Sequence, residues 1–339
     1  MYNYGVWAIY CEAYNSATEV TQNFYCYNNT IYWKRWYFND AAKDVWFDVS
    51  VVHIQTKHLE YYNNYVENII TSSPRIHART MAELHFPDGF VSGNTHIGGE
   101  QAFLYVAWPT TWTTYDASYV GSVIFENNTT IKTGTVALTL NANTGSGINV
   151  KNLIIRNNTF GMYLRGVLYG NPTLGVWFHK DGSWPAEMYD IEITGNTFTL
   201  TWDTSKYANI AAVKTGYDGS GTSGDGLIYM RNAHTVRRVK IENNTVNNFP
   251  FSFLHLYRAD NSSGTYVHEN ITVKGNKIND SCYAISYSNI NRACFSFGAV
   301  NGIDIQNNEV KNPNVALKGQ SQEWDYITNK TYSGNTFTT

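Results

Sequence analysis

The sequence has little charge and no long apolar segment. Lysine and arginine number 24 and aspartate and glutamate 27 among 339 residues, which gives a net charge of -3. These charges form no basic stripe, so the sequence does not favour a nucleic-acid partner. No segment approaches the roughly 18 apolar residues of a membrane-spanning helix, and we expect no membrane span. The first residues also lack the basic and apolar regions of a secretory signal peptide.

Strong helix-forming patterns are missing, and residues that disfavour helix are abundant. The chain contains 39 asparagines and 26 glycines, together with 26 tyrosines, 16 phenylalanines and 10 tryptophans. Asparagine, glycine and threonine disfavour helix, and they favour strands joined by tight turns. So many aromatic rings need burial, which argues against a disordered chain. The composition therefore predicts an all-β protein.

One pattern recurs along the chain: two apolar residues in alternation, a turn with asparagine, and then threonine or an apolar residue. Clear copies are IFENNTT at 124–130, IIRNNTF at 154–160, KIENNTV at 240–246 and DIQNNEV at 304–310. The nine steps between the first and last aligned asparagine average 34 residues. These asparagines are Asn29, Asn64, Asn94, Asn128, Asn158, Asn196, Asn244, Asn276, Asn308 and Asn335.

A second apolar segment lies between successive asparagines, so each period holds at least two short strands and no helical pattern. Stacked coils of parallel strands fit this content, with about 4.8 Å added per coil. The second strands are expected at 5–14, 49–55, 102–109, 135–142, 175–182, 209–219, 251–261, 282–289 and 315–320. The residues expected to stack in one narrow core are Ile154, Ile191, Ile193, Val239, Ile241, Ile303 and Ile305.

The repeated asparagine has a physical role in such a stack. A bend between strands needs a residue that tolerates positive φ, and asparagine is one of the few that do. When the coils are in register, each side-chain amide can hydrogen bond to the amides above and below it and so form a ladder.

These repeats resemble those of the right-handed parallel β-helix, or pectate-lyase-like, superfamily. The resemblance rests on the pattern I-x-I-x-x-N-x-(Thr/Val/Phe) and covers essentially the whole chain. It implies an all-β, right-handed parallel β-helix of about ten coils with an asparagine ladder, in a single domain over 1–339. The superfamily includes polysaccharide lyases, glycoside hydrolases, epimerases, adhesins and phage tailspikes, so the fold leaves the activity open.

The repeat runs close to both ends of the sequence, and no capping helix is visible at the N-terminus. We therefore expect a fragment of a longer chain, or a rod whose ends partner chains cover, as in a homotrimeric tailspike. Two longer segments, about 160–174 and 216–236, flank neighbouring coils. They could wall one groove or be neutral surface insertions.

The second strands of three consecutive coils end in ionisable residues, which are candidates for catalysis. Hydrolysis of a glycosidic bond needs two carboxylates, and Asp181, Asp218 and Asp260 are the candidates. Elimination from a uronate needs a cation or arginine and a base. The candidates for that chemistry are Lys180, Lys214, Tyr257 and Arg258. The alternative is a solvated face whose charges only aid solubility.

Aromatic and imidazole side chains beside this patch are candidates for substrate binding, because aromatic faces stack on sugar rings. They are Trp177, His179, Trp184, Tyr217, His255 and Tyr257. Further aromatic residues are expected to be exposed, or else buried under loops or in an interface. They are Trp33, Trp36, Tyr37, Trp108 and Trp112.

Metal and disulfide signals are weaker. The segment from Asp218 to Asp225 spaces oxygen ligands at alternating positions, as some Ca²⁺ loops do, although a flexible glycine-serine loop has the same composition. His53 and His58 form no recognisable zinc pattern. The pairs Cys11/Cys26 and Cys282/Cys294 each fall within one coil, which permits either disulfides or buried thiols.

Two functions follow from this pattern. The first is a β-helix at the cell exterior or virion surface that binds a polysaccharide, either without cleaving it or with cleavage as a hydrolase or lyase. The second is a noncatalytic structural or adhesive rod, such as a viral fibre segment or a cell-surface repeat protein. The missing signal peptide favours a phage-type protein, because virion parts assemble in the cytoplasm.

Overall fold

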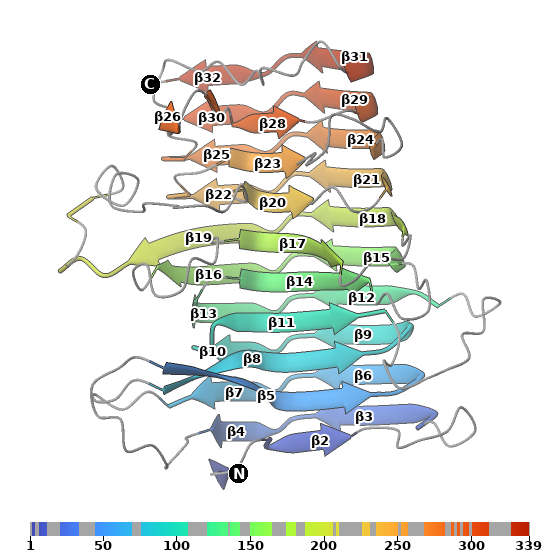
Figure 1. The fold of residues 1–339 in the computed structure, drawn as a ribbon, viewed down its shortest axis with the longest axis vertical. Coiled ribbons are helices and arrows are strands. Elements are labelled where there is room, and N and C mark those ends of the chain that lie inside the picture. Colours follow the sequence, from blue (N-terminus) through green and yellow to red (C-terminus); the bar gives the residue numbers. More distant parts are fainter. Residues whose placement is uncertain are drawn as a thin grey trace.

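Successive coils of the chain add strands to three parallel sheets, and this arrangement confirms the predicted all-β parallel β-helix. The computed structural model shows the coils stacked from the N-terminus at one end to the C-terminus at the other (Figure 1). In the residues described, no helix is present, and hence none that could cross a membrane. The structure describes residues 2–3, 7–11, 21–33, 45–69, 76–107, 121–134, 136–142, 150–164, 174–180, 187–205, 208–209, 226–230, 235–249, 252–256, 268–281, 286–287, 290–291, 294–297, 300–311 and 327–338.

The three sheets are called A, B and C. Sheet A contains β1 (Tyr2–Asn3), β4 (Thr30–Trp33), β7 (Tyr65–Asn68), β10 (Thr95–Ile97), β13 (Thr129–Thr133), β16 (Thr159–Leu164), β19 (Thr197–Trp202), β22 (Thr245–Asn247), β25 (Lys277–Asn279), β30 (Glu309–Lys311) and β32 (Thr336–Thr338). Sheet B contains β2 (Ile9–Cys11), β5 (Val45–Gln55), β8 (Ile76–His85), β11 (Gln101–Val106), β14 (Val136–Ala142), β17 (Leu174–Lys180), β20 (Gly226–Met230), β23 (Ser252–Leu256) and β28 (Phe295–Phe297). Sheet C contains β3 (Asn23–Tyr27), β6 (His58–Tyr62), β9 (Asp88–Ser92), β12 (Val123–Glu126), β15 (Val150–Arg156), β18 (Glu187–Thr194), β21 (Thr235–Glu242), β24 (His268–Lys274), β29 (Val300–Gln306) and β31 (Ile327–Ser333). The short strands β26 (Ser286–Tyr287) and β27 (Ile290–Asn291) pair antiparallel outside these sheets.

Two of the expected second strands lie elsewhere in the chain. Between β17 and β23, sheet B contains β20, so the predicted strand at 209–219 is not the one in this position. Next to β23 the sheet contains β28, whereas part of the predicted strand at 282–289 pairs antiparallel as β26. In both coils several apolar segments compete for one place in the sheet, and composition alone does not rank them. Sequence reasoning also missed β8.

Inward-facing side chains stack in columns through the centre of the helix. On sheet C, Leu153 pairs with Ile191 and Ile155 pairs with Ile193, and all four are buried. Ile154 lies between the two inward residues of its strand, so its side chain faces outward. The expectation that Ile154 belongs to the core is therefore wrong. The other predicted core residues, Ile191, Ile193, Val239, Ile241, Ile303 and Ile305, are buried as expected.

The predicted asparagine ladder is confirmed and links all ten aligned asparagines. Asn128 shows the pattern: its Nδ2 donates to Asn158 Oδ1 and to the Val91 carbonyl, both at 2.9 Å. Its Oδ1 accepts from the Nδ2 and the backbone N–H of Asn94, at 2.9 and 3.0 Å. Both amide protons and both oxygen lone pairs are thus used in a buried position. The side-chain bonds continue from Asn29 to Asn335 at 2.8–3.0 Å.

The left-handed bend lies one residue earlier than we expected. Positive φ occurs at the residue before each ladder asparagine and not at the ladder asparagine itself. Asn157 has a φ of 55°, for example, and Gly195 has a φ of 65°. The first residue of each pair therefore forms the bend, and the second forms the ladder. This division explains the repeated Asn-Asn and Gly-Asn pairs. The bend residues are Asn28, Asn63, Gly93, Asn127, Asn157, Gly195, Asn243, Gly275, Asn307 and Gly334.

The cysteines behave differently at the two ends of the molecule. Cys294 is disulfide-bonded, whereas Cys11 and Cys26 are free thiols. Cys26 lies beneath the first step of the ladder, where the Asn29 amide donates to its sulfur at 3.5 Å. Burial raises the pKa of the Cys26 thiol to about 11, although the Asn29 hydrogen bond opposes this rise. A disulfide between Cys11 and Cys26 is therefore not present.

Two histidines are buried within the stack as neutral side chains. His96 is enclosed between the Tyr61 hydroxyl, 3.1 Å from its Nε2, and the Ala102 carbonyl, 3.2 Å from its Nδ1. His268 stands in an otherwise apolar column on sheet C, paired with Val300 in the next coil. Burial lowers the pKa of each imidazole to about 4, since a charged ring loses its hydration inside the core.

We predict that the ladder position and the bend position respond oppositely to glycine. Asn158→Gly removes four hydrogen bonds of a buried amide and should lower the free energy of unfolding by about 3–5 kcal/mol. Asn157→Gly keeps a residue that accepts positive φ and should change this free energy by less than about 1 kcal/mol. Urea unfolding followed by circular dichroism measures both. Equal losses in the two variants would show that the two roles are not separated.

We also predict that part of the acid sensitivity of the protein comes from His268. Because the folded pKa lies below the unfolded value, stability is full above about pH 6.5 and falls as the pH drops toward 4. The loss from this one group is on the order of 3 kcal/mol. His268→Val should therefore flatten the pH dependence of unfolding between pH 7 and 4 relative to the wild type. Parallel profiles for the two proteins would contradict this assignment.

Candidate functional site

The predicted catalytic patch falls partly on sheet B, where three of its side chains are described. Trp177 and His179 both lie on β17, with ring centroids 4.2 Å apart. His255 lies on β23, and Tyr229 of β20 stands between it and Trp177 in register. The Tyr229 and His255 ring centroids are 5.3 Å apart. Trp177, Tyr229 and His255 thus form one row across three coils.

Two residues of this row are buried, and Trp177 is partly buried. Tyr229 is 3% exposed and His255 is 7% exposed, and Trp177 packs against Tyr229 and Val136. Sequence reasoning missed Tyr229, because β20 lies within the segment 216–236 that we took for an insertion. The available signal was the apolar run GLIYM at 226–230, which has the length of a buried strand.

The remaining candidates of the patch lie outside the residues that the structure describes, and they stay predictions. Lys180 is the last residue of β17, but its side chain is not among those described. The catalytic and binding candidates concerned are Asp181, Trp184, Lys214, Tyr217, Asp218, Tyr257, Arg258 and Asp260, and the proposed Ca²⁺ loop with Asp225 belongs with them.

One of the aromatic residues singled out in the sequence, Trp33, lies in the described part of the chain. Trp33 is fully buried in sheet A, where it packs in the core, so the exposed alternative is wrong for this residue. Trp36, Tyr37, Trp108 and Trp112 lie outside the described part of the chain. The large apolar side chains with clear exposure include Trp7, Tyr10, Tyr25 and Tyr27. All four belong to the coil nearest the N-terminus.

Four aromatic side chains line the solvent face of sheet C in the first three coils. We call Tyr25, Tyr27, Tyr62 and Phe90 the aromatic strip. Tyr27 and Tyr62 stack with their ring centroids 5.0 Å apart and their planes 8° from parallel. Phe90 follows in the next coil, 5.7 Å from Tyr62. Tyr25 and Tyr27 are 55% and 49% exposed, so much of their ring surface contacts water.

A histidine between two carboxylates borders the aromatic strip on the same face. The His58 Nδ1 lies 2.6 Å from an Asp88 carboxylate oxygen, and its Nε2 lies 3.5 Å from Glu60. Partial burial opposes protonation of His58, but the hydrogen bonds to Asp88 and Glu60 outweigh it and raise the imidazole pKa. Tyr25 lies beside this group, with its ring centroid 6.4 Å from that of His58.

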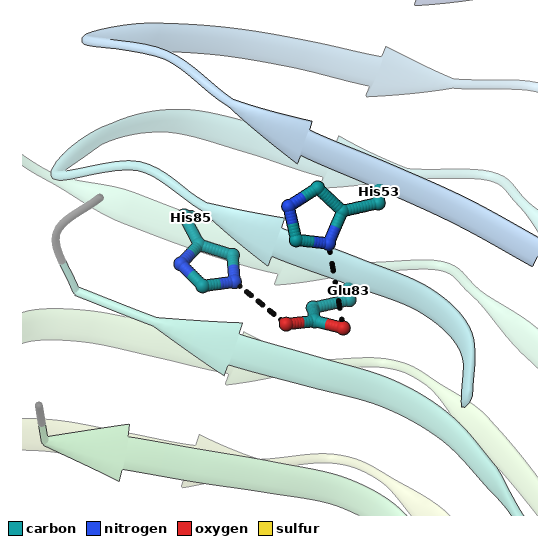
Figure 2. A group of neighbouring side chains, drawn as sticks. All are labelled: His53, Glu83 and His85. Carbon is teal, nitrogen blue, oxygen red and sulfur yellow. Dashed lines mark hydrogen bonds and ion pairs between the residues drawn. The ribbon is translucent and has the colours of Figure 1, made fainter. Parts of the chain in front are cut away.

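A second polar cluster lies on the outer face of sheet B. His53 of β5 pairs in register with Glu83 of β8, and His85 follows two residues after Glu83 on the same face. Figure 2 shows the Glu83 carboxylate between the two imidazole rings. The His85 Nε2 donates to Glu83 Oε1 at 2.9 Å, and the His53 Nδ1 lies 3.4 Å from Glu83 Oε2.

The electrostatics of this cluster favour an ionised Glu83. Burial opposes the charge, but the hydrogen bonds from His53 and His85 outweigh burial and hold the pKa of the carboxyl well below its usual range. The Ser50 hydroxyl also donates to Glu83 Oε2. Gln55 contacts the other nitrogen of His53, with its Nε2 3.0 Å from the His53 Nε2. Two imidazoles and one carboxylate are thus oriented by neighbouring polar groups.

Sequence reasoning missed this cluster because its members come from different coils. His53 and Glu83 are 30 residues apart, and only the register of β5 and β8 brings them together. A local motif search compares residues within a short window and cannot detect such a group. The usable signal was the alternation HIQ at 53–55 and ELH at 83–85, once the two strands are aligned.

Sheet C also carries a shallow groove of about 540 Å³ farther along the rod. It follows a column of left-handed residues that kink successive strands, namely Asn152, Asp190, Arg238 and Asn270. The Arg238 guanidinium binds both Asp190 oxygens, at 2.6 and 2.9 Å, and lowers the pKa of that carboxyl. Lys240 pairs with Glu192 at 2.7 Å. Because these charges neutralise one another across coils, the groove presents no field of one sign.

Comparison with known proteins identifies no relative of this chain: no family model, no curated protein and no solved structure matches it.

Proposed function

We propose that this chain is a surface-exposed β-helix that binds a polysaccharide, and that the aromatic strip on sheet C is its binding surface. The exposed side chains of Tyr25 and Tyr27, together with the Tyr62 ring stacked on Tyr27, carry the proposal. Sugar rings present flat C–H surfaces, and aromatic faces bind such surfaces with a large contact area. Exposed apolar patches of this kind are rare on soluble proteins unless they contact a ligand or partner.

The direction of the strip suits a linear polymer. Tyr27 and Tyr62 pair in register in adjacent coils, and Phe90 of the next coil lies opposite Glu60, two residues to one side of that column. The rings therefore cross three successive coils along the stacking axis. The coil spacing of about 4.8 Å repeats along this axis. A chain of sugar units that lies along the rod would therefore meet one aromatic side chain after another.

The border of the strip supplies hydrogen-bonding groups. Glu60 and Asp88 flank His58 on the same face and offer carboxylate oxygens to sugar hydroxyls. Hydrogen bonds to charged acceptors are stronger than those between neutral groups. An aromatic platform with polar groups at its edge combines the two kinds of contact that a sugar requires.

Two further observations support this proposal. The repeats resemble the pectate-lyase-like superfamily, which includes polysaccharide lyases, glycoside hydrolases and phage tailspikes. The disulfide at Cys294 is typical of proteins that work outside the reducing cytosol, at the cell exterior or on a virion. A noncatalytic structural or adhesive rod is the second candidate, and the unbroken ladder favours it, because such a ladder stiffens the whole stack.

The proposal predicts that polysaccharide binding depends on the aromatic rings of Tyr27 and Tyr62. The protein is screened against a panel of acidic and neutral polysaccharides by affinity electrophoresis, and the dissociation constant for the best ligand is then measured. Tyr27→Ala/Tyr62→Ala should weaken binding about tenfold or more, because two stacking contacts are lost. Tyr27→Phe/Tyr62→Phe should stay close to the wild type, since both rings remain.

A second tyrosine pair on another sheet provides the matched control. Tyr32 and Tyr65 contact each other in the same two coils but on sheet A, with ring centroids 5.8 Å apart. Tyr32→Ala/Tyr65→Ala should leave the affinity unchanged. If no polysaccharide binds, or if the sheet C variant binds as well as the wild type, the proposal fails.

Incubation of the protein with the same polysaccharides, followed by product analysis, distinguishes a binding rod from an enzyme. New reducing ends would assign hydrolysis, and an ultraviolet-absorbing unsaturated product would assign elimination. Binding without either product would assign the adhesive rod.

A further inference from the structure

We infer that His53, Glu83 and His85 form a binding site for a divalent transition metal ion, and that Zn²⁺ is the ion that fits this ligand set. The inference concerns the outer face of sheet B and is independent of carbohydrate binding on sheet C. It rests on the positions of three donor atoms, on their chemical types, and on the side chains that hold them.

The donor atoms converge on one point. One donor atom from each of His53, Glu83 and His85 lies within 4.8 Å of the other two. The His85 Nε2 lies 2.9 Å from Glu83 Oε1, and the His53 Nδ1 lies 3.4 Å from Glu83 Oε2. A tetrahedral Zn²⁺ with bonds of about 2.0–2.2 Å sets its ligand atoms roughly 3.3–3.6 Å apart. Small side-chain rotations therefore bring the three donors to coordination distance without a change in the backbone.

The register of β5 and β8 positions the side chains of this cluster. His53 and Gln55 on β5 lie opposite Glu83 and His85 on β8, so four polar side chains form a square on one face. On the far side of β8, Leu104 and Val106 of β11 occupy the two facing positions. The polar side chains are thus confined to the β5–β8 pair and do not continue onto β11.

The donor types select the metal. Two imidazoles and one carboxylate are a ligand set that proteins use for Zn²⁺ sites with an open fourth position. Hard cations such as Ca²⁺ and Mg²⁺ prefer sites made only of oxygen ligands, so this cluster disfavours them. A carboxylate together with two neutral imidazoles would leave a site with Zn²⁺ a single net positive charge, which a partly exposed position tolerates.

Neighbouring side chains orient the ligands, as partners of metal ligands do in known sites. Ser50 donates to the Glu83 carboxylate, and Gln55 contacts the His53 Nε2. When His53 Nδ1 binds the metal, its Nε2 carries the proton, and a rotation of the Gln55 amide places the side-chain oxygen as the acceptor. The Tyr10 ring stacks on His53 with a centroid distance of 5.2 Å and fixes the plane of the imidazole.

The cluster is accessible from solvent on one side. The Glu83 side chain is 23% exposed and the His53 side chain 12%, whereas His85 is nearly buried. Tyr10, which covers His53, is itself 44% exposed. An ion can therefore enter, and a water or a small anionic ligand can occupy the fourth coordination position.

Direct metal binding tests the inference. The full chain is treated with a chelator, exchanged into metal-free buffer and titrated with Zn²⁺ by isothermal calorimetry. We expect one Zn²⁺ per chain. Glu83→Gln and His85→Ala should each weaken binding at least tenfold, whereas Glu126→Gln, the same carboxylate-to-amide change beside Arg156 on sheet C, should leave it unchanged. Absence of binding, or equal affinity in all variants, would overturn the inference.

A spectroscopic measurement keeps the test independent of how well the variants fold. X-ray absorption of the wild-type protein with one equivalent of Zn²⁺ should show a nitrogen- and oxygen-coordinated ion with two imidazole ligands. The affinity of Gln55→Ala should fall about tenfold while the two-imidazole signature remains, because that side chain only orients His53. A spectrum without imidazole ligands would place the ion elsewhere and contradict the site.

Discussion

A buried amide that is stacked on identical amides constrains this whole structure. In the interior of a protein, an amide that loses its contact with water must find partners for two protons and two lone pairs. The ladder solves this problem between neighbouring coils: each interior asparagine donates to the next asparagine and to a backbone carbonyl, and accepts from the previous one. A shift of one coil by a single residue would leave several of these groups unpaired. The ladder therefore holds every coil at one height and in one register.

The register in turn places the groups that we connect with function. The stacking of Tyr27 on Tyr62 and the approach of His53 to Glu83 both join residues in adjacent coils at equivalent positions. Neither contact is local in the sequence. Both follow from the rule that equivalent positions in a parallel stack lie about 4.8 Å apart. A solenoid can thus assemble a binding surface from one residue per coil, provided that the coils do not slip.

Buried and exposed side chains alternate along the strands of sheet C, but not along β20 and β23 of sheet B. This difference distinguishes the two candidate binding surfaces. Sheet C has one buried and one solvent-facing side, so its outward tyrosines and charges contact water. In sheet B, strands β20 and β23 are buried on both faces, and the row of Trp177, Tyr229 and His255 is packed. A row of this kind contributes apolar packing, whereas the outward face of sheet C is suited to contact with a long ligand. For this reason we place the proposed binding surface on sheet C, while the patch predicted from the sequence stays a prediction.

The sequence predicted the repeat well, because each ladder asparagine combines an unusual residue with a fixed local setting. It predicted individual strands less well where two apolar segments fall in one period, as with 209–219 and β20. It placed the left-handed bend at the wrong residue of each pair, since both residues are often asparagine and composition does not distinguish them. The metal cluster was beyond sequence reasoning, because its three donors meet only after two strands 30 residues apart are aligned.

Exchange of the asparagine side-chain amide hydrogens tests the central claim most directly. With the asparagines labelled with nitrogen-15, nuclear magnetic resonance follows each Nδ2 group after transfer to deuterated water. The account predicts that the eight buried ladder residues, from Asn64 to Asn308, exchange their Nδ2 hydrogens only when the stack opens, far more slowly than the bend asparagines such as Asn28 and Asn157. Fast exchange at the interior ladder positions, equal to that of the bend residues, would show that these amides are not held in a continuous buried chain.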